Sequence, residues 1–179
     1  MGFLDLEGKT VLVTGVANRR SVAWHVHRGL VEAGARPIHV VRDEATRSVT
    51  AKLLDGFVVH VCDVEQQAQI DALAARLEHD GVELHGLVHS IAFANYAGGV
   101  RPFHETERAD FLQALDISCF SLVALSRALA PRLTPGASVV TISISHTHLA
   151  VESYGYMAPI KAALDSSLAF LAKSNGLSE

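Results

Sequence analysis

Short runs of β-branched residues alternate along the chain with longer segments of helical periodicity, and this alternation restricts the possible folds more than any other feature. The runs are too short and too continuously apolar for amphipathic helices, so each is expected to be a strand buried on both faces. They are Lys9–Thr14, Pro37–Val41, Phe57–Val61, Leu84–His89 and Ser138–Ile142. Apolar spacings of three and four residues predict helices at Ser21–Gly34, Glu44–Leu54, Glu65–Asp80, Glu105–Leu133 and Tyr154–Ser174. Elements in this order predict a parallel sheet with right-handed crossovers and helices on both faces.

The length predicts one domain over residues 1–179, with a Rossmann-like, doubly wound α/β architecture. Hydrophobic residues make up 49% of the chain, enough for one core. The net charge of −4 and the lack of a basic run argue against nucleic-acid and anionic-membrane partners. Uninterrupted apolar runs are too short to span a bilayer. Cys62 and Cys119 form neither a disulfide framework nor a zinc pattern, so we expect two small buried residues in a cytoplasmic protein.

A glycine turn between the first strand and the first helix is the first candidate site. Gly15 follows the strand, and Ser21 stands where the loop meets the helix. Free backbone N–H groups and the dipole at a helix N-terminus favour a bound phosphate, and Ser21 could both cap the helix and bind a pyrophosphate oxygen. The usual G-x-G-x-x-G is absent. A purely structural corner explains a glycine and a serine equally well, so this segment alone leaves both interpretations open.

Polar and small residues also follow the other predicted strands, at the carboxyl ends where α/β proteins bind ligands. Arg42 and Asp43 end the second strand, where an adenosine ribose would lie. Asp63 ends the third strand and could accept a hydrogen bond from an adenine amino group. The fourth strand ends in the small residues of Ser90–Ala94. Each charge alone is most simply a surface residue, but together these positions predict a dinucleotide site.

Two of the three tyrosines, Tyr154 and Tyr156, stand shortly before Lys161 near the start of the last predicted helix. A tyrosine hydroxyl beside an ammonium group is a natural proton donor or oxyanion stabiliser, because the cation favours the developing phenolate. Ser143, at the end of the fifth strand, could supply another donor. The alternative is a surface tyrosine and a lysine at a helix start.

These motifs resemble the short-chain dehydrogenase/reductase superfamily and, within it, the bacterial enoyl-acyl-carrier-protein reductases of type II fatty-acid synthesis. The resemblance runs from about residue 8 to residue 173. In place of the superfamily's T-G-x-x-x-G-x-G and Y-x-x-x-K, the chain has the reductase pattern. Its motifs are G-x5-S-x-A (Gly15–Ala23), S-I-A-F-A (Ser90–Ala94), D-I-S (Asp116–Ser118) and Y-x6-K (Tyr154–Lys161).

The resemblance implies reduction of a trans-2-enoyl thioester on acyl carrier protein by NADH, with NADPH possible. Tyr154 would hydrogen-bond the thioester carbonyl and stabilise the enolate, and Lys161 would bind the nicotinamide ribose. Cofactor-binding residues would be Gly15, Ala17, Ser21, Val22, Arg42, Asp63, Val64, Ser90, Ile91, Ala92 and Lys161. Substrate-binding residues would be Ala94, Ile144 and Tyr154. A homotetramer with contacts along the predicted helix within residues 103–133 and the helix after it is also implied.

The chain departs from the family pattern in three respects. Ile144 stands where the family usually has a second aromatic residue, ten positions before the catalytic tyrosine, so a wall of the acyl pocket and the sensitivity to inhibitors are expected to differ. His25 replaces a helix glycine and is expected to alter the packing of the first helix on the sheet. The family continues with sixth and seventh strands, so we expect five of its seven strands and a C-terminally truncated chain.

Two alternatives remain open. One is a carbonyl reductase of the same superfamily, against which the Y-x6-K spacing argues, and the other is a non-catalytic dinucleotide-binding fragment. The histidines raise the question of a metal site, and His146 and His148 are the closest pair in the sequence. Without a third ligand and a carboxylate partner that pair is not a site, so no metal is expected.

Overall fold

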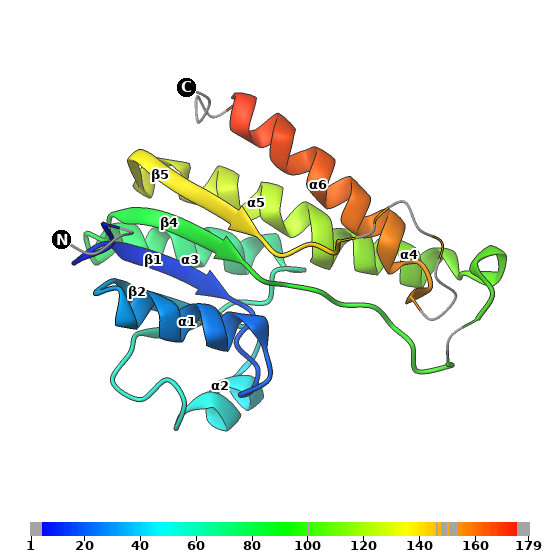
Figure 1. Cartoon of the computed structure of the whole chain (residues 1–179), viewed down its shortest axis with the longest axis horizontal. Coiled ribbons are helices and arrows are strands. Elements are labelled where there is room, and N and C mark those ends of the chain that lie inside the picture. Colours follow the sequence, from blue (N-terminus) through cyan, green and yellow to red (C-terminus); the bar gives the residue numbers. More distant parts are fainter. Residues whose placement is uncertain (1–4, 100, 146, 148–149, 151–153, 175–179) are drawn as a thin grey trace.

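Five parallel strands form one sheet in the order β3-β2-β1-β4-β5 (Figure 1). The computed structural model describes residues 5–99, 101–145, 147, 150 and 154–174. The strands are β1 (Thr10–Thr14), β2 (Arg36–Val41), β3 (Val59–Val61), β4 (Leu84–His89) and β5 (Leu133–Thr141). The order reverses between β1 and β4, which is the switch point of a doubly wound sheet. The predicted parallel α/β architecture is therefore confirmed.

Six α-helices connect and cover the strands in the described part of the chain. They are α1 (Val22–Glu32), α2 (Glu44–Thr50), α3 (Gln67–His79), α4 (Arg108–Leu115), α5 (Ser121–Leu129) and α6 (Met157–Ser174). Between α4 and α5, residues Asp116–Phe120 form a π-helical turn, so the long predicted helix is interrupted within its length. Short 3-10 turns occupy Phe103–Glu105 and Ala130–Arg132.

The fifth strand begins earlier than predicted, at Leu133 rather than Ser138, and it runs through Pro135 and Gly136. Proline and glycine argue against a central strand because proline cannot donate to the ladder. Within the described residues, however, β5 pairs with β4 only, and the register shifts between Leu84 and Gly86. An edge strand with an irregular pairing accepts both residues.

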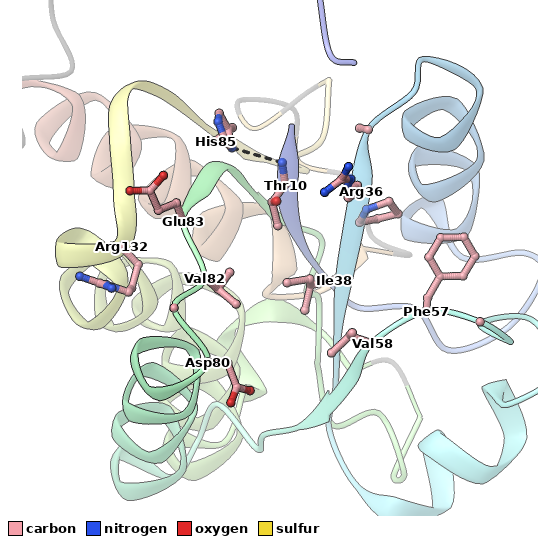
Figure 2. A pocket seen from close by; sticks show the side chains of 14 residues that line it. Thr10, Arg36, Ile38, Phe57, Val58, Asp80, Val82, Glu83, His85 and Arg132 are labelled. Carbon is pink, nitrogen blue, oxygen red and sulfur yellow. Dashed lines mark hydrogen bonds between the residues drawn. The ribbon is translucent and has the colours of Figure 1, made fainter. Parts of the chain in front are cut away.

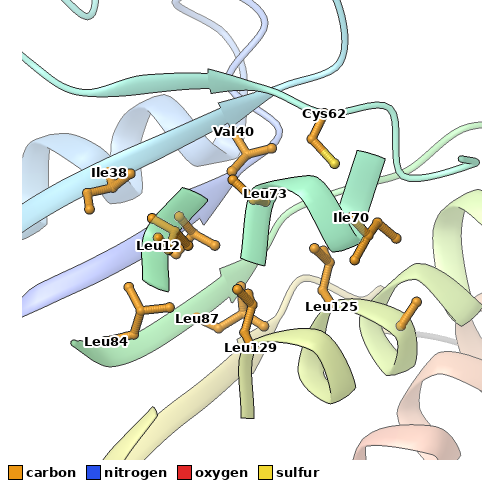
Figure 3. Packing of buried hydrophobic residues seen from close by; sticks show 12 residues of the cluster. Leu12, Ile38, Val40, Cys62, Ile70, Leu73, Leu84, Leu87, Leu125 and Leu129 are labelled. Carbon is orange, nitrogen blue, oxygen red and sulfur yellow. The ribbon is translucent and has the colours of Figure 1, made fainter. Parts of the chain in front are cut away.

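The two faces of the sheet are covered by different helices. Leucines of β1 and β4 pack against leucines of α3 and α5 on one face, as Figure 3 shows for Leu12, Leu87, Leu73 and Leu125. On the other face, α1 packs over the valines of β1. A third cluster joins α6 to α5 and the π-turn. The carboxyl ends of the strands lie on the side of the molecule where α1 and α6 begin (Figure 1).

The helical stretch Arg108–Arg132 is long and apolar enough to cross a membrane, judged by length and composition alone. The sequence-based expectation that no segment is long enough to span a bilayer was too narrow, because it counted only uninterrupted apolar runs. Leu122, Leu125 and Leu129 of this stretch are fully buried against the rest of the fold. Packing in the protein interior therefore explains much of its apolar character.

A buried histidine pair, rather than His25, joins α1 to the sheet. His25 is exposed, so the expectation that it alters helix packing is wrong. His27 lies two residues later, is 4% exposed, and places Nδ1 3.0 Å from Nε2 of the fully buried His39 on β2. Trp24 stacks on the His27 ring, and Phe57 contacts both imidazoles edge-on. The face of α1 that meets the sheet therefore carries His27 and not His25.

Candidate functional site

The glycine turn after β1 brings the ends of β1 and β4 into contact. Gly15 has a φ of +88°, and a Cβ placed there would lie 1.9 Å from the carbonyl oxygen of Ser90. Thr14 fixes the same approach, because its Oγ1 donates to the Val88 carbonyl (3.2 Å) and accepts from the Ser90 N–H (3.1 Å). Only glycine fits at position 15, and two of the residues predicted to bind the cofactor, Gly15 and Ser90, are neighbours.

The loop after Gly15 leaves the N-terminus of α1 open. Ser21 occupies the N-cap position, but its side chain does not cap the helix as predicted. Its hydroxyl donates to the Asn18 carbonyl (2.6 Å) and accepts from the Ala17 N–H (3.4 Å) instead. Within Val22–Glu32, the first turn carries no acidic residue. The first N–H groups of this eleven-residue helix therefore have no competing carboxylate, which suits a phosphate.

Charged side chains follow β2 and β3 at the same edge of the sheet. Asp43 caps α2, because its Oδ1 accepts from the Thr46 N–H (2.7 Å), and its Oδ2 accepts from Arg42 Nε (2.9 Å). The hydrogen bonds from Thr46, followed by that from Arg42, lower the pKa of Asp43 to about 2. Asp63 is held in a turn, where its Oδ1 accepts from the Glu65 N–H (3.1 Å). Both carboxylates are therefore oriented by local hydrogen bonds.

Lys161 is a buried cation between the ends of β4 and β5. Its side chain is 3% exposed, and Nζ donates to the carbonyl oxygens of Ile142 (2.9 Å) and Ile91 (3.1 Å). Burial lowers the pKa of Lys161. An ammonium group has three donors, so one N–H remains for a ligand. Next to Ile142, the buried Ser143 hydroxyl has no hydrogen-bond partner among the described residues, so its proton is available to a ligand.

The two tyrosines of the Y-x6-K segment lie in different environments. Tyr154 is 41% exposed, and its carbonyl oxygen accepts from the Tyr96 hydroxyl (2.9 Å). Tyr156 is 5% exposed, and its hydroxyl donates to the Asn95 carbonyl (3.1 Å). Gly155 between them has a φ of +53°, in the left-handed region. Tyr154 is therefore the more exposed of the two, and the Tyr156 hydroxyl is already bound to the backbone.

The expected acyl-pocket residues and the remaining cofactor residues lie around this edge. Ala94 packs against the cluster that contains Tyr156, and Ile144 is half-buried. Val22 and Ala92 are exposed, and Ile91 is half-buried beside Lys161. Val64 packs on the main core and Ala17 is exposed in the loop. None of these contacts assigns a ligand by itself.

A cavity of about 690 Å³ lies at the opposite end of the sheet. Figure 2 shows its lining, which comes from the amino ends of the strands and includes Thr10, Arg36 and His85. The Thr10 N–H donates to His85 Nδ1 at 3.2 Å. No residue of the predicted site lines this cavity, so its size does not bear on the dinucleotide site.

No group of three potential metal ligands gathers in the part of the chain that the structure describes. His146 and His148, the pair weighed from the sequence, lie outside the described residues. Sequence reasoning missed the polar contacts that hold the segment after β4. Ser118 belongs to the D-I-S motif, and its hydroxyl accepts from the Phe93 N–H (2.8 Å) and donates to the Phe93 carbonyl (2.9 Å). The motif itself was the available signal.

Comparison with known proteins gives a consistent result. The family model described as enoyl-(acyl carrier protein) reductase matches residues 15–178. The chain is 37% identical over 177 residues to the NADH-dependent enoyl-[acyl-carrier-protein] reductase FabI of Bacillus subtilis, an alignment covering 96% of this chain and 69% of that protein. The enoyl-acyl carrier protein reductase of Bacillus cereus, solved with NADP+ and indole naphthyridinone, superposes with a TM-score of 0.91 at 34% identity and covers 96% of this chain and 69% of that one. The Anaplasma phagocytophilum reductase with NAD gives 0.90 at 28% identity, with 96% and 67% covered.

Proposed function

This chain belongs to the enoyl-(acyl carrier protein) reductase family, and from that premise we propose which of its residues carry the reaction. The reaction is the reduction of a trans-2-enoyl thioester on acyl carrier protein in fatty-acid elongation, with NADH or NADPH as the reductant. When bound, the dinucleotide supplies the hydride. The protein's part is to hold the two reactants and to stabilise the charge that develops on the thioester oxygen.

The residues at the ends of β1 and β4 fit a dinucleotide. The Gly15 turn lets backbone approach closely, and the first N–H groups of α1 are available for the pyrophosphate. Gly15, Ala17, Ser21 and Val22 would form this part of the site. Residues further along the edge would complete it: Arg42, Asp63, Val64, Ser90, Ile91 and Ala92. The fit rests on the close approach of Gly15 to the Ser90 backbone, which a Cβ at position 15 would prevent.

The buried ammonium of Lys161 is the observation that carries the assignment of the reactive end. Two of its N–H groups bind the carbonyls of Ile91 and Ile142, and the third is free for the hydroxyl groups of the nicotinamide ribose. Because Ile91 follows β4 and Ile142 follows β5, the lysine also fixes the separation of the two strand ends. We therefore assign Lys161 to cofactor binding in the ground state.

Tyr154 would donate a hydrogen bond to the thioester oxygen as the hydride reaches the β-carbon. Its exposed position leaves the hydroxyl accessible, whereas the Tyr156 hydroxyl already donates to Asn95. Removal of one oxyanion donor typically costs about 10²–10³ in kcat. Ser143, with a buried hydroxyl that lacks a partner among the described residues, would supply a second donor. Ala94 and Ile144 would contact the acyl chain, with Ile144 giving an aliphatic wall.

NADH is the reductant that the end of β2 favours. The exposed Arg42 guanidinium is paired with Asp43, and Glu44 follows directly. A 2′-phosphate on the ribose would meet two carboxylates as well as the arginine, which disfavours NADPH without excluding it. The ratio of kcat/KM for NADH to that for NADPH tests this, and a tenfold preference for NADPH would refute it.

We further propose a homotetramer in the cytoplasm, built from a single dinucleotide-binding domain over residues 1–179. Large apolar side chains are exposed on the helices expected to form the subunit contact, namely Leu112 (48%), Phe120 (53%) and Phe170 (75%). Exposed apolar side chains that gather into one patch favour an interface. The net charge of −4 offers no support for a nucleic-acid partner. Sedimentation analysis of the purified chain would measure the assembly.

The test of the proposed function compares crotonyl with acetoacetyl thioesters while NADH consumption is followed. Reduction of the crotonyl thioester alone is expected, and reduction of the ketone alone would support the carbonyl reductase instead. Tyr154→Phe should lower kcat about 10²–10³-fold with little change in NADH affinity. Lys161→Met should weaken NADH binding. If Tyr156→Phe abolishes turnover while Tyr154→Phe does not, the assignment is wrong.

A further inference from the structure

The end of β4 and the segment that follows it are held at three points by side chains from four other elements. Lys161 of α6 donates to the Ile91 carbonyl. Ser118 of the π-turn makes two hydrogen bonds to the backbone of Phe93 (2.8 and 2.9 Å). At the start of the segment, the fully buried His89 contacts Ser121 of α5 and Thr141 of β5. The proposed cofactor residues Ser90, Ile91 and Ala92 all lie between these anchors.

The hydrogen-bond geometry assigns one tautomer to His89. Its Nε2 lies 2.8 Å from Ser121 Oγ, and that hydroxyl lies 2.6 Å from the Ile117 carbonyl. A serine hydroxyl has a single proton, and a carbonyl oxygen can only accept, so the Ser121 proton must point to Ile117. His89 therefore carries its proton on Nε2 and donates to Ser121. Its unprotonated Nδ1 lies 3.0 Å from Thr141 Oγ1, whose single proton can point to Nδ1 or to the His89 carbonyl oxygen at 3.2 Å.

These hydrogen-bonded side chains join three elements. They run from Thr141 at the end of β5, through His89 at the end of β4, to Ser121 and the π-turn. The Ser121 N–H donates to the Asp116 carbonyl five residues earlier, so the same serine also closes the π-turn that carries Ser118. Burial, followed by the nearby Lys161 charge, lowers the pKa of His89 to about 3, so the ring keeps its neutral form.

We propose that His89 and Ser121 are positioning residues for the cofactor site. Through their hydrogen bond they fix the backbone from residue 89 to residue 93, and so the Ile91 carbonyl that orients the Lys161 ammonium. The Ile142 N–H donates to the His89 carbonyl (3.0 Å), so the second carbonyl partner of Lys161 depends on the same anchor. The inference rests on the proposed function, because it concerns the site assigned there to the nicotinamide ribose.

The experiment measures NADH binding by fluorescence titration, together with KM and kcat, for a matched set of serine variants. Ser121→Ala removes the acceptor of the His89 proton. Ser126→Ala is the control, because Ser126 is a buried serine of the same helix whose hydroxyl has no hydrogen-bond partner among the described residues. Thermal unfolding is recorded for each variant, so that binding is compared only between folded proteins.

We expect Ser121→Ala to weaken NADH binding about fivefold or more, with a matching rise in KM and a smaller change in kcat. Ser126→Ala should bind NADH as the wild type does. His89→Gln, whose side-chain amide can replace the Nε2 donor, should retain most of the affinity, and it should lose this advantage when combined with Ser121→Ala.

Equal NADH affinity in folded Ser121→Ala and Ser126→Ala would overturn the positioning role. If His89→Gln binds NADH no better than His89→Leu, the assigned donor is wrong and the proposal fails. If the wild-type chain does not bind NADH, the proposed function itself is refuted. If the wild type binds NADH and the variants bind it equally well, only the positioning role is refuted.

Discussion

The buried pair formed by His27 and His39 should make the protein sensitive to mild acid. The two rings share one hydrogen bond of 3.0 Å beneath α1, and the remaining His39 nitrogen, Nδ1, is buried with no partner among the described residues. His27 is the titratable group whose charge bears on His39, and the aromatic rings of Trp24 and Phe57 complete the surroundings. A proton added to this pair would therefore be buried without a counter-charge.

The size of the effect follows from the pKa of His39, which burial, and then the charge of His27, lower from 6.5 to about 4. A histidine whose pKa is lower in the folded state stabilises the protein above the unfolded value of 6.5. That stability is lost as the pH falls from 6.5 toward 4. The total loss is about 3 kcal/mol, of which roughly 2 kcal/mol falls between pH 7 and 4.5. Burial also lowers the pKa of His27, which adds to the loss in the same direction.

The assay is urea unfolding of the wild type and of His27→Leu/His39→Leu at pH 7 and pH 4.5. Replacing both rings avoids leaving one nitrogen without its partner. The wild type should lose roughly 2 kcal/mol more than the double variant across this interval, because His89 and all other groups are common to both proteins. His25→Gln, at an exposed position of the same helix, is the control and should follow the wild type. Equal losses in the wild type and the double variant would refute the reasoning.

Two further predictions concern the site. Gly15→Ala should abolish NADH binding and lower the urea midpoint of unfolding, because the added Cβ meets the Ser90 carbonyl at 1.9 Å. The control Gly56→Ala, with a φ of +80° and nothing within 4 Å of the added Cβ, should lower the free energy of unfolding by only about 1–2 kcal/mol through the left-handed backbone. Equal stability losses in the two variants would contradict the close approach of Gly15 to Ser90. Tyr156→Phe should lower the free energy of unfolding by about 1 kcal/mol, through the lost hydrogen bond to the Asn95 carbonyl, and leave kcat unchanged. Tyr154→Phe should lower kcat and leave the free energy of unfolding unchanged, as unfolding curves and turnover measured on the same preparations would show.

The strand-end positions of the site were readable from the sequence because each depends on local geometry. Gly15 follows a buried strand and precedes a helix, and this arrangement fixes where the turn lies relative to the sheet. Lys161 stands in the first turns of α6, so the helix start determines that the lysine comes back to the ends of β4 and β5. Parallel strands then bring these segments to one edge without any information about side-chain contacts.

The contacts between elements could not be read in the same way. The role of Ser21 as a cap was predicted from residue type, but Asn18 competes for its hydroxyl, and only the loop conformation decides which bond forms. The packing of α1 could not be predicted for the same reason. His25 and His27 are two residues apart, and only the orientation of the helix on the sheet decides which of them is buried. A helical rotation of 100° per residue separates a buried position from an exposed one, and periodicity alone leaves that phase uncertain by about one residue.

The tyrosine pair shows why residue spacing and backbone conformation must be considered together. Y-x6-K selects Tyr154 by its distance along the chain from Lys161, yet Tyr156 is chemically identical and stands two residues closer to that lysine. The left-handed Gly155 stands between two environments: Tyr154 is exposed, and the hydroxyl of the buried Tyr156 is bound to the Asn95 carbonyl. A Cβ at Gly155 would come within 3.0 Å of the Tyr96 hydroxyl, which itself holds the Tyr154 carbonyl. The accessibility of the proposed donor therefore depends on a glycine that takes no part in the chemistry.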